Sequence, residues 1–341
     1  MPDRLLPGNQ RHDGEYEDLL SLWSDLESAL SVVLSAPLRV QDFPAKVRQL
    51  DRWLQDLVAQ DIDAALYLMF QLASTSTVGY SASHALVCGT LCHIMAQALQ
   101  LPTRERDSLV RAALTMNIGM TALQDLLAEQ RDRPSAAQQE AIRNHPRESQ
   151  TLLERLFVTD NLWLDVVGQH HASISDRVPL ASQEPHDRLT RILGTIDRYA
   201  AMMSPRKSRA SRSATDSVRA IVRNEVDHRD DVSYTLVRSV GLCPPGTFVR
   251  LDNGDTAIVL RRGEKANQPI VASLLDRTGV HHARPGIYQT GTTGKPRIQS
   301  ALARSAVQVE LNHRTMVRLG LYAATPHNSG LMGLVTAAGA L

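Results

Sequence analysis

The chain has 341 residues, of which 43% are hydrophobic, 21% charged and 4% aromatic, a composition typical of a folded globular protein with room for two or three domains. Lys and Arg number 37 and Asp and Glu 36, so the chain has no overall charge that would draw it to DNA, RNA or an anionic membrane. No stretch approaches the roughly 18 apolar residues of a membrane span, so we expect no membrane insertion.

Helical periodicity dominates the first 240 residues. From 16 to 75 the apolar residues recur at intervals of three and four, and Pro37 and Pro44 separate a first helix from a second. Asp61 stands where it can cap a third helix. We therefore expect residues 1–75 to form a helical lead-in, followed by a helical domain over residues 76–240.

The next helix, at about 78–99, has polar residues within its apolar run. His84, Cys88 and Cys92 are four residues apart, so side chains from adjacent turns of this helix can reach one ligand. We interpret the two cysteines as small core residues, because free cysteine is often buried. The chain has three cysteines in all, and this odd number favours a reducing compartment and a cytoplasmic location.

Further helical patterns follow, and Gly119 predicts a break after the first of them. They cover about 102–114, 122–129, 135–145, 146–157, 161–171 and 186–203, and two more end near Val240.

At Gly241 the pattern changes to short alternating or β-branched runs. Asn253-Gly254 between two of these runs predicts a hairpin, so we expect a small antiparallel β-extension over residues 241–325. We place His281 and His282 in a solvated loop. The Gly- and Ala-rich residues 326–341 predict a disordered tail. The expected fold class is mainly α, with helical parts before this β-extension.

Several segments of the helical domain together resemble the HD-GYP family, the bacterial signalling phosphodiesterases that hydrolyse cyclic di-GMP at a metal site on a helical bundle. The matching segments are Tyr80-Ser81-Ala82-Ser83-His84, Arg111-Ala112-Ala113-Leu114, Ile118-Gly119, Ala141-Ile142-Arg143-Asn144-His145-Pro146, Gln169-His170-His171, the segment Ile192 to Met202, and Pro244-Pro245-Gly246-Thr247-Phe248-Val249. The resemblance covers roughly residues 80–259. It implies an HD-type helical bundle with a binuclear or trinuclear metal centre.

The resemblance also implies roles for individual residues. In the family, one metal position would use the residues that match His84 and Asp197, and another those that match His145, His170 and His171. Two arginines after the last metal-binding Asp approach the nucleotide phosphates in the family; they match Arg206 and Arg209.

The chain departs from the family at its defining doublet. Where the family has His-Asp, this chain has Met116-Asn117. The Asp of the doublet bridges two metals as an anion, and the neutral amide of Asn117 cannot supply that charge. Met116 offers a soft thioether, which is a poor partner for hard divalent ions. We therefore expect no intact catalytic set.

A second departure lies after the paired histidines. The loop that follows keeps only Pro179 of the family motif, and in the family this loop is linked to contacts with diguanylate cyclase domains. In the family this loop also shapes the entrance of the substrate pocket. The shape of that entrance and the contact with a diguanylate cyclase are therefore both in question for this chain.

These residues lead to one main interpretation. We expect a catalytically impaired HD-GYP-like protein that acts as a binding or interaction module in bacterial cyclic di-GMP signalling. Its cofactor would be one divalent ion (Fe, Mn or Zn) on His145, His170 and His171, or none. Its partners would be cyclic di-GMP or a related nucleotide, a signalling protein such as a diguanylate cyclase, and a second copy in a homodimer.

Two alternatives stay open. The first is an active metal-dependent cyclic di-GMP phosphodiesterase with a rebuilt metal site, in which His84, Cys88 or Asn117 serves as a substitute ligand. The second is a scaffold that docks a partner through the helical lead-in and binds no nucleotide.

Overall fold

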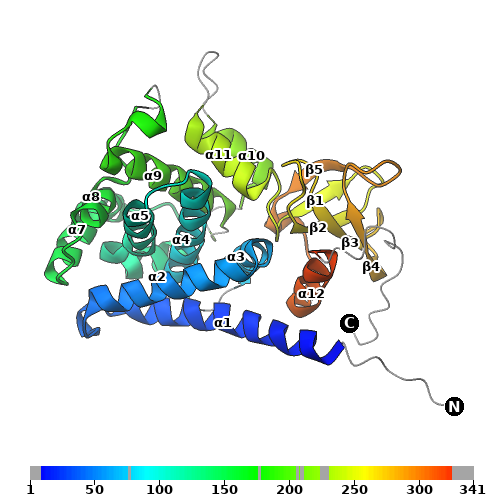
Figure 1. Ribbon diagram of the computed structural model, residues 1–341, viewed down its shortest axis with the longest axis horizontal. Helices are drawn as coiled ribbons and strands as arrows, with labels where there is room; N and C mark the ends of the chain where they lie inside the picture. The colour runs from blue at the N-terminus through cyan, green and yellow to red at the C-terminus, as the bar shows by residue number, and fades with distance from the viewer. Residues whose placement is uncertain are drawn as a thin grey trace.

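The computed structural model describes residues 9–75, 78–175, 178–204, 207, 211–222 and 230–324. Helices build one side of the molecule and a small antiparallel sheet lies beside them, which confirms the mainly helical fold (Figure 1). The helices are α1 (Asn9–Ser35), α2 (Phe43–Gln60), α3 (Ile62–Thr75), α4 (Tyr80–Ala98), α5 (Thr103–Thr115), α6 (Thr121–Glu129), α7 (Ala136–Arg155), α8 (Asn161–Gln169), α9 (Pro185–Met203), α10 (Ala214–Ile221), α11 (Asp231–Val240) and α12 (His313–Ala324). None of these is long and apolar enough to cross a membrane. The expected tail, 326–341, lies outside the described residues.

The N-terminal helices are separated where the sequence predicts, although α1 begins at Asn9, earlier than the pattern from 16 indicates. Pro37 lies in the connection between α1 and α2, and Pro44 is the second residue of α2. The carboxylate of Asp61 accepts hydrogen bonds from the backbone N–H groups of Asp63 and Ala64 at 2.9 and 3.0 Å, which caps α3 as expected. These helices pack against α4, and their buried side chains join the main hydrophobic core.

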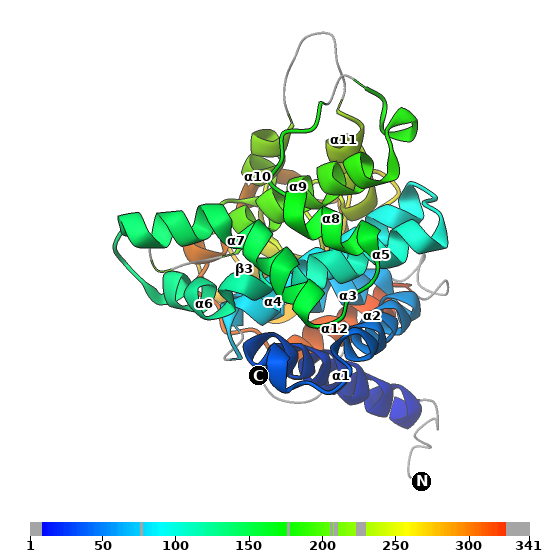
Figure 2. The ribbon, with the colours of Figure 1, turned by 90° about the vertical axis from the view of Figure 1, so that its left-hand side faces the viewer.

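Helix α4 lies at the centre of the bundle. Every residue from Ser81 to Ala96 is buried, and α4 contacts α1, α3, α5 and α9 (Figure 2). Cys88 and Cys92 are completely buried, which confirms their place in the core. Because α4 is enclosed on all sides, it has no polar face, and its histidines enter the interior.

Helix α7 corrects one prediction. The sequence predicts a helix that ends at His145 and another that begins at Pro146, but α7 runs unbroken through Pro146. A proline inside a helix removes one backbone hydrogen bond, the one to the carbonyl four residues earlier. Here that carbonyl belongs to Ile142, and the ring of His145 contacts it instead. The helix continues because a side chain fills the place of the missing N–H.

The sheet has five antiparallel strands in the order β4-β3-β2-β1-β5. They are β1 (Phe248–Leu251), β2 (Thr256–Arg261), β3 (Ile270–Leu275), β4 (His281–Gln289) and β5 (Ile298–Leu302). Phe248 pairs with Ile258 and Arg250 with Thr256, and Gly254 turns the chain between β1 and β2 at a φ of 91°. The predicted Asn253-Gly254 hairpin is confirmed.

The C-terminal part holds more structure than the sequence indicates. His281 and His282 lie on strand β4, so their placement in a loop is wrong, although His281 is exposed to solvent as expected. The ring of His282 lies 3.2 Å from the carboxylate of Asp255 on the hairpin. Pro285 and Gly286 within β4 hide its strand pattern. Helix α12 packs on β2 and β3 and on the N-terminal helices α1 and α3.

Ion pairs join the helices to the sheet. Arg261 at the end of β2 contacts Asp61 at 2.8 Å and Asp63 at 3.2 Å. The neighbouring Arg262 contacts Asp63 at 2.7 Å and donates to the carbonyl of Ser239 in α11. The start of α3, the end of β2 and the end of α11 are thereby held together.

Candidate metal centre

Four helices bring the candidate ligands to one region of the bundle. His84 lies on α4, His145 on α7, and Asp197 on α9. His170 and His171 follow directly after the last residue of α8. The candidate ligand atoms fall into two groups, and within each group all of them lie within 4.8 Å of one another.

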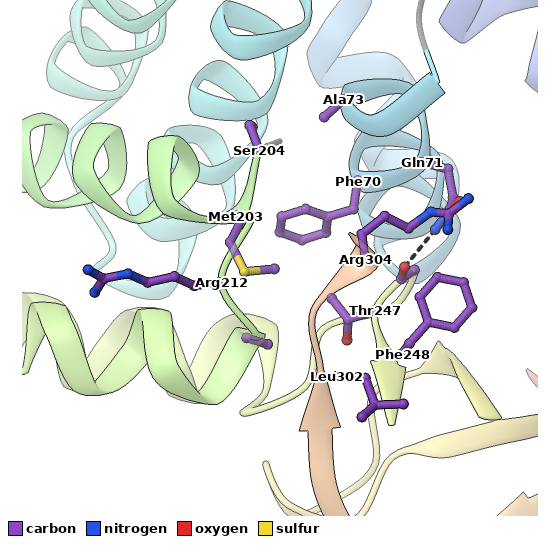
Figure 3. Close-up of a pocket in the computed structure, with 12 residues that line it drawn as sticks. Phe70, Gln71, Ala73, Met203, Ser204, Arg212, Thr247, Phe248, Leu302 and Arg304 are labelled. Carbon is purple, nitrogen blue, oxygen red and sulfur yellow. Dashed lines mark hydrogen bonds between the residues drawn. The ribbon is translucent and has the colours of Figure 1, made fainter. Parts of the chain in front are cut away.

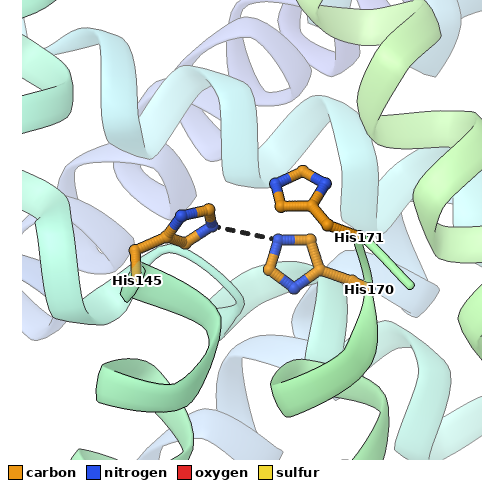
Figure 4. Close-up of side chains that lie close together, drawn as sticks. All are labelled: His145, His170 and His171. Carbon is orange, nitrogen blue, oxygen red and sulfur yellow. Dashed lines mark hydrogen bonds between the residues drawn. The ribbon is translucent and has the colours of Figure 1, made fainter. Parts of the chain in front are cut away.

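The first group, His145, His170 and His171, is here called the open half. Figure 4 shows the three rings turned toward one another. Their centroids are 5.0 Å apart for His145 and His170, 5.1 Å for His145 and His171, and 4.2 Å for the two adjacent histidines. His145 and His170 are buried, whereas 46% of the His171 side chain is exposed. One side of this group therefore faces solvent.

Backbone contacts determine which nitrogen of the buried histidines carries a hydrogen. Nδ1 of His145 lies 2.6 Å from the carbonyl oxygen of Ile142, and Nδ1 of His170 lies 2.7 Å from that of Val167. A carbonyl oxygen only accepts, so each Nδ1 is the donor, and in a neutral ring the Nε2 is then an acceptor. The two Nε2 atoms lie 3.1 Å apart. Two lone pairs thus point into the same space, where a cation would satisfy both.

The protonation of these rings supports the same arrangement. Burial, with a smaller effect from the neighbouring His171, lowers the pKa of His170 to about 3. Burial also lowers the pKa of His145. Both rings are therefore neutral near pH 7. No proton lies between the two Nε2 atoms to form a hydrogen bond, so their lone pairs face each other. A carbonyl behind each ring is also the usual support of a histidine that binds a metal. These residues fit a divalent ion.

The second group, His84, Cys88 and Asp197, is here called the closed half. Nε2 of His84 lies 2.9 Å from Oδ1 of Asp197 and 3.6 Å from Sγ of Cys88. The His84 ring stacks on the ring of Tyr80, with centroids 5.5 Å apart. His84 and Cys88 are buried and Asp197 is 14% exposed. This group lies inside the bundle.

Asp197 lies between the two halves. While its Oδ1 faces His84, its Oδ2 lies 4.0 Å from Nδ1 of His171. Burial alone would raise the pKa of Asp197, but the hydrogen bond with His84, with smaller effects from the neighbouring imidazole rings, holds it well below its ordinary value. Asp197 is therefore an anion at neutral pH. It is the negative charge next to both groups of ligands.

Close packing of α9 on α8 puts Asp197 in this position. A Cβ atom on Gly194 would come within 2.5 Å of the carbonyl oxygen of His170. Only glycine lets the two helices approach so closely here. Nothing in the local sequence pattern distinguishes this glycine from one that weakens a helix.

The doublet positions do not contribute a charged ligand. Met116, at the end of α5, is 1% exposed and its side chain joins the apolar core. Asn117 is partly buried and precedes a short 3-10 helix, Ile118–Met120. The structure confirms a break in the helical chain before Gly119.

The predicted phosphate contacts cannot be placed. Arg206 and Arg209 lie outside the described residues, as do residues 176 and 177 of the loop after the histidines.

A small cavity of about 30 Å³ lies elsewhere, where α3 and the end of α9 meet β1 and β5. Figure 3 shows Phe70, Phe248 and Arg304 among its walls. It has room for about two water molecules. None of the described residues that line it belongs to either half of the candidate metal centre.

Comparison with known proteins places these residues in context. The chain is 27% identical over 189 residues to the cyclic di-GMP phosphodiesterase PA4108 of Pseudomonas aeruginosa. The match covers 54% of this chain and 45% of that protein, so the chain spans about half the length of this relative. Among solved structures, Bd1817, a HDG"Y"P protein from Bdellovibrio bacteriovorus, aligns with a TM-score of 0.46 and 13% identity over 63% of this chain and 68% of that one. No family model matches the chain.

Proposed function

We propose that this chain is a catalytically impaired member of the HD-GYP family. The sequence motifs indicate this family, and the match to a cyclic di-GMP phosphodiesterase supports it. It would act as a binding or interaction module in cyclic di-GMP signalling. Its ligand would be cyclic di-GMP or a related nucleotide, held next to the open half.

One observation carries this proposal. Met116 and Asn117 stand where the family has its His-Asp doublet, and Met116 is buried among apolar side chains rather than directed at a metal. Without the bridging carboxylate, hydroxide cannot be held between two ions in line with a phosphorus atom. The remaining candidate ligands can still bind an ion, but the two-ion arrangement that would hydrolyse cyclic di-GMP is missing.

The open half supports the binding role. His145, His170 and His171 would hold one divalent ion of iron, manganese or zinc. When bound, such an ion supplies a positive charge that three neutral rings do not cancel, so it attracts an anion such as a phosphate group. Because His171 is exposed, a nucleotide could approach from solvent. Arg206 and Arg209 are proposed as further phosphate contacts.

Turnover of cyclic di-GMP by the purified chain, with added manganese or ferrous ion, tests the proposal. We expect no pGpG or GMP above background by chromatography. Formation of product that the His171→Ala variant abolishes would show that the retained ligands suffice, and the proposal would be wrong.

Calorimetry with cyclic di-GMP separates binding from hydrolysis. We expect heat of binding from the wild-type chain and none from His170→Ala. A folded wild-type chain that gives no heat would instead favour the docking scaffold, in which the partner, a diguanylate cyclase or a second copy, contacts the N-terminal helices.

A second candidate function has one specific observation in its favour. Asp197 presents one oxygen to His84 and the other toward His171, so it could link two ions in place of the missing doublet carboxylate. The chain would then be an active phosphodiesterase with a rebuilt site. In that case Asp197→Asn should abolish turnover together with His171→Ala.

A further inference from the structure

Cys88 lies beside two candidate ligands that the family resemblance supplies, and the ligand atoms of all three lie within 4.8 Å of one another. We propose that the Cys88 thiolate, with His84 and Asp197, forms a closed metal site that prefers zinc to manganese. This inference goes beyond the proposed function, because that function needs an ion only at the open half.

The distances suit one ion. Zinc binds imidazole nitrogen at about 2.0–2.1 Å, thiolate sulfur at about 2.3 Å and carboxylate oxygen at about 2.0–2.2 Å. Tetrahedral ligands at those lengths lie about 3.3–3.7 Å apart. The His84 nitrogen and the Cys88 sulfur lie 3.6 Å apart, and the carboxylate oxygen of Asp197 lies 2.9 Å from the same nitrogen. A small movement of the carboxylate completes three corners.

Helix geometry places these donors. His84 and Cys88 are one turn apart on α4, so both side chains project from the same face of that helix. Asp197 reaches them from α9, which packs directly on α4. Two packed helices hold the three donors more rigidly than a loop would.

The charges of the site balance when an ion is bound. A neutral His84, an anionic Asp197 and a Cys88 thiolate carry two negative charges, which cancel those of a divalent cation. A neutral assembly is the one that a buried site tolerates best, since an uncompensated charge is costly to bury. The open half, with three neutral rings, keeps the ion's charge and needs an outside anion.

Cys88 also decides which ion is preferred. Its sulfur lies 3.6 Å from Nε2 of His84, within reach of an ion held there. When the ion binds, a sulfur–metal bond replaces the S–H bond and the proton leaves to solvent. Thiolate is a soft ligand that suits zinc, whereas manganese prefers oxygen ligands. Asn117, at the doublet position, offers no such donor.

Cobalt(II) provides the direct test, because thiolate bound to cobalt gives a charge-transfer band in the near ultraviolet. The full chain, freed of metal with a chelator, is titrated with cobalt(II). The chain has three cysteines. We expect the band in the wild-type chain and in the Cys92→Ala/Cys243→Ala variant, where Cys88 is the remaining thiol. We expect its loss in Cys88→Ala.

The outcomes are decisive in both directions. A folded wild-type chain without the band, or a band that survives Cys88→Ala, overturns the proposal. Should Cys88→Ala fail to fold, the variant that keeps Cys88 alone still decides: a band supports the site and its absence contradicts it. The preference for zinc over manganese should also fall by at least about 10-fold in Cys88→Ala. Turnover of cyclic di-GMP would contradict the proposed function but would leave this band unchanged.

Discussion

The open and closed halves of the candidate metal centre lie side by side but are organised differently. In the open half, carbonyl oxygens hold the Nδ1 atoms of His145 and His170, which leaves each Nε2 directed at a common point. In the closed half, the Nε2 of His84 already contacts Asp197. The two groups of candidate ligands are thus not equivalent: the open half has two nitrogens free for an ion, whereas an ion in the closed half would have to replace an existing contact.

Restoring the His-Asp doublet should have the largest effect. If the two halves do not act together because the bridging carboxylate is missing, Met116→His with Asn117→Asp should raise cyclic di-GMP turnover from background to a measurable rate. Product formation with added manganese, followed by chromatography, measures this. The single change Met116→Leu, which keeps an apolar side chain in the core, should remain inactive. A folded double variant without activity would mean that other departures also prevent catalysis.

Removing one ligand tests whether the open half binds an ion by itself. His170→Ala should weaken metal binding there by at least about 100-fold, since changes to supporting residues alone cost about 10–100-fold. Competition with a chelating dye measures the affinity. His186→Ala removes an exposed histidine that contacts Asp187 and should have no effect. Equal losses in both variants would contradict the assignment.

Low pH can destabilise the fold and can also release a bound ion from its histidine ligands. His93 allows the first effect to be measured separately from the second. It lies on the same helix as His84 but hydrogen-bonds Gln97 rather than a carboxylate. Burial, with a smaller effect from Arg106, lowers the pKa of His93 to about 4. The unfolded state binds a proton first, near its ordinary pKa of about 6.5, so stability is complete above that pH and falls as the pH drops toward 4.

The loss should reach about 3 kcal/mol at most. Urea unfolding of the metal-free chain at several pH values measures it, and His93→Gln should flatten the curve below pH 6.5. An unchanged pH dependence in this variant would assign the acid effect to other groups.

The smallest expected effect concerns the carbonyl behind His145. Pro146→Ala supplies an N–H that competes for the oxygen of Ile142, so the ring of His145 would lose its support. Metal affinity of the open half should fall by about 10-fold, up to about 100-fold, while the helix gains a backbone hydrogen bond. Chelator competition and urea unfolding should therefore change in opposite directions. Parallel changes would show that the proline acts only on the fold.

Local signals in the sequence predict much of the fold. The helical spacing, the cap at Asp61 and the Asn253-Gly254 turn are each readable from neighbouring residues, and each is confirmed. The signals fail where a distant contact replaces a local one. Helix α7 continues through Pro146 because a side chain takes its place in the hydrogen bonding, and β4 forms because β3 pairs with it despite Pro285 and Gly286.

The candidate site is predictable to a similar extent. The family resemblance indicates His84, His145, His170, His171 and Asp197, and the structure brings all five into two adjacent groups. Their roles as ligands stay predictions. The spacing within α4 already predicts that Cys88 lies beside His84. The approach of Asp197 to this pair depends on how α9 packs on α4, which no spacing within α4 reveals.

The ion pairs of Asp61 and Asp63 with Arg261 and Arg262 have a consequence for how the molecule comes apart. They connect residues about two hundred positions apart, and the hydrophobic core beneath them runs from α1 through the sheet to α12. Cutting the chain between the helices and the sheet would leave these charges without their partners and uncover apolar surface on both sides. In thermodynamic terms, we expect the helices and the sheet to unfold together in a single transition rather than piece by piece.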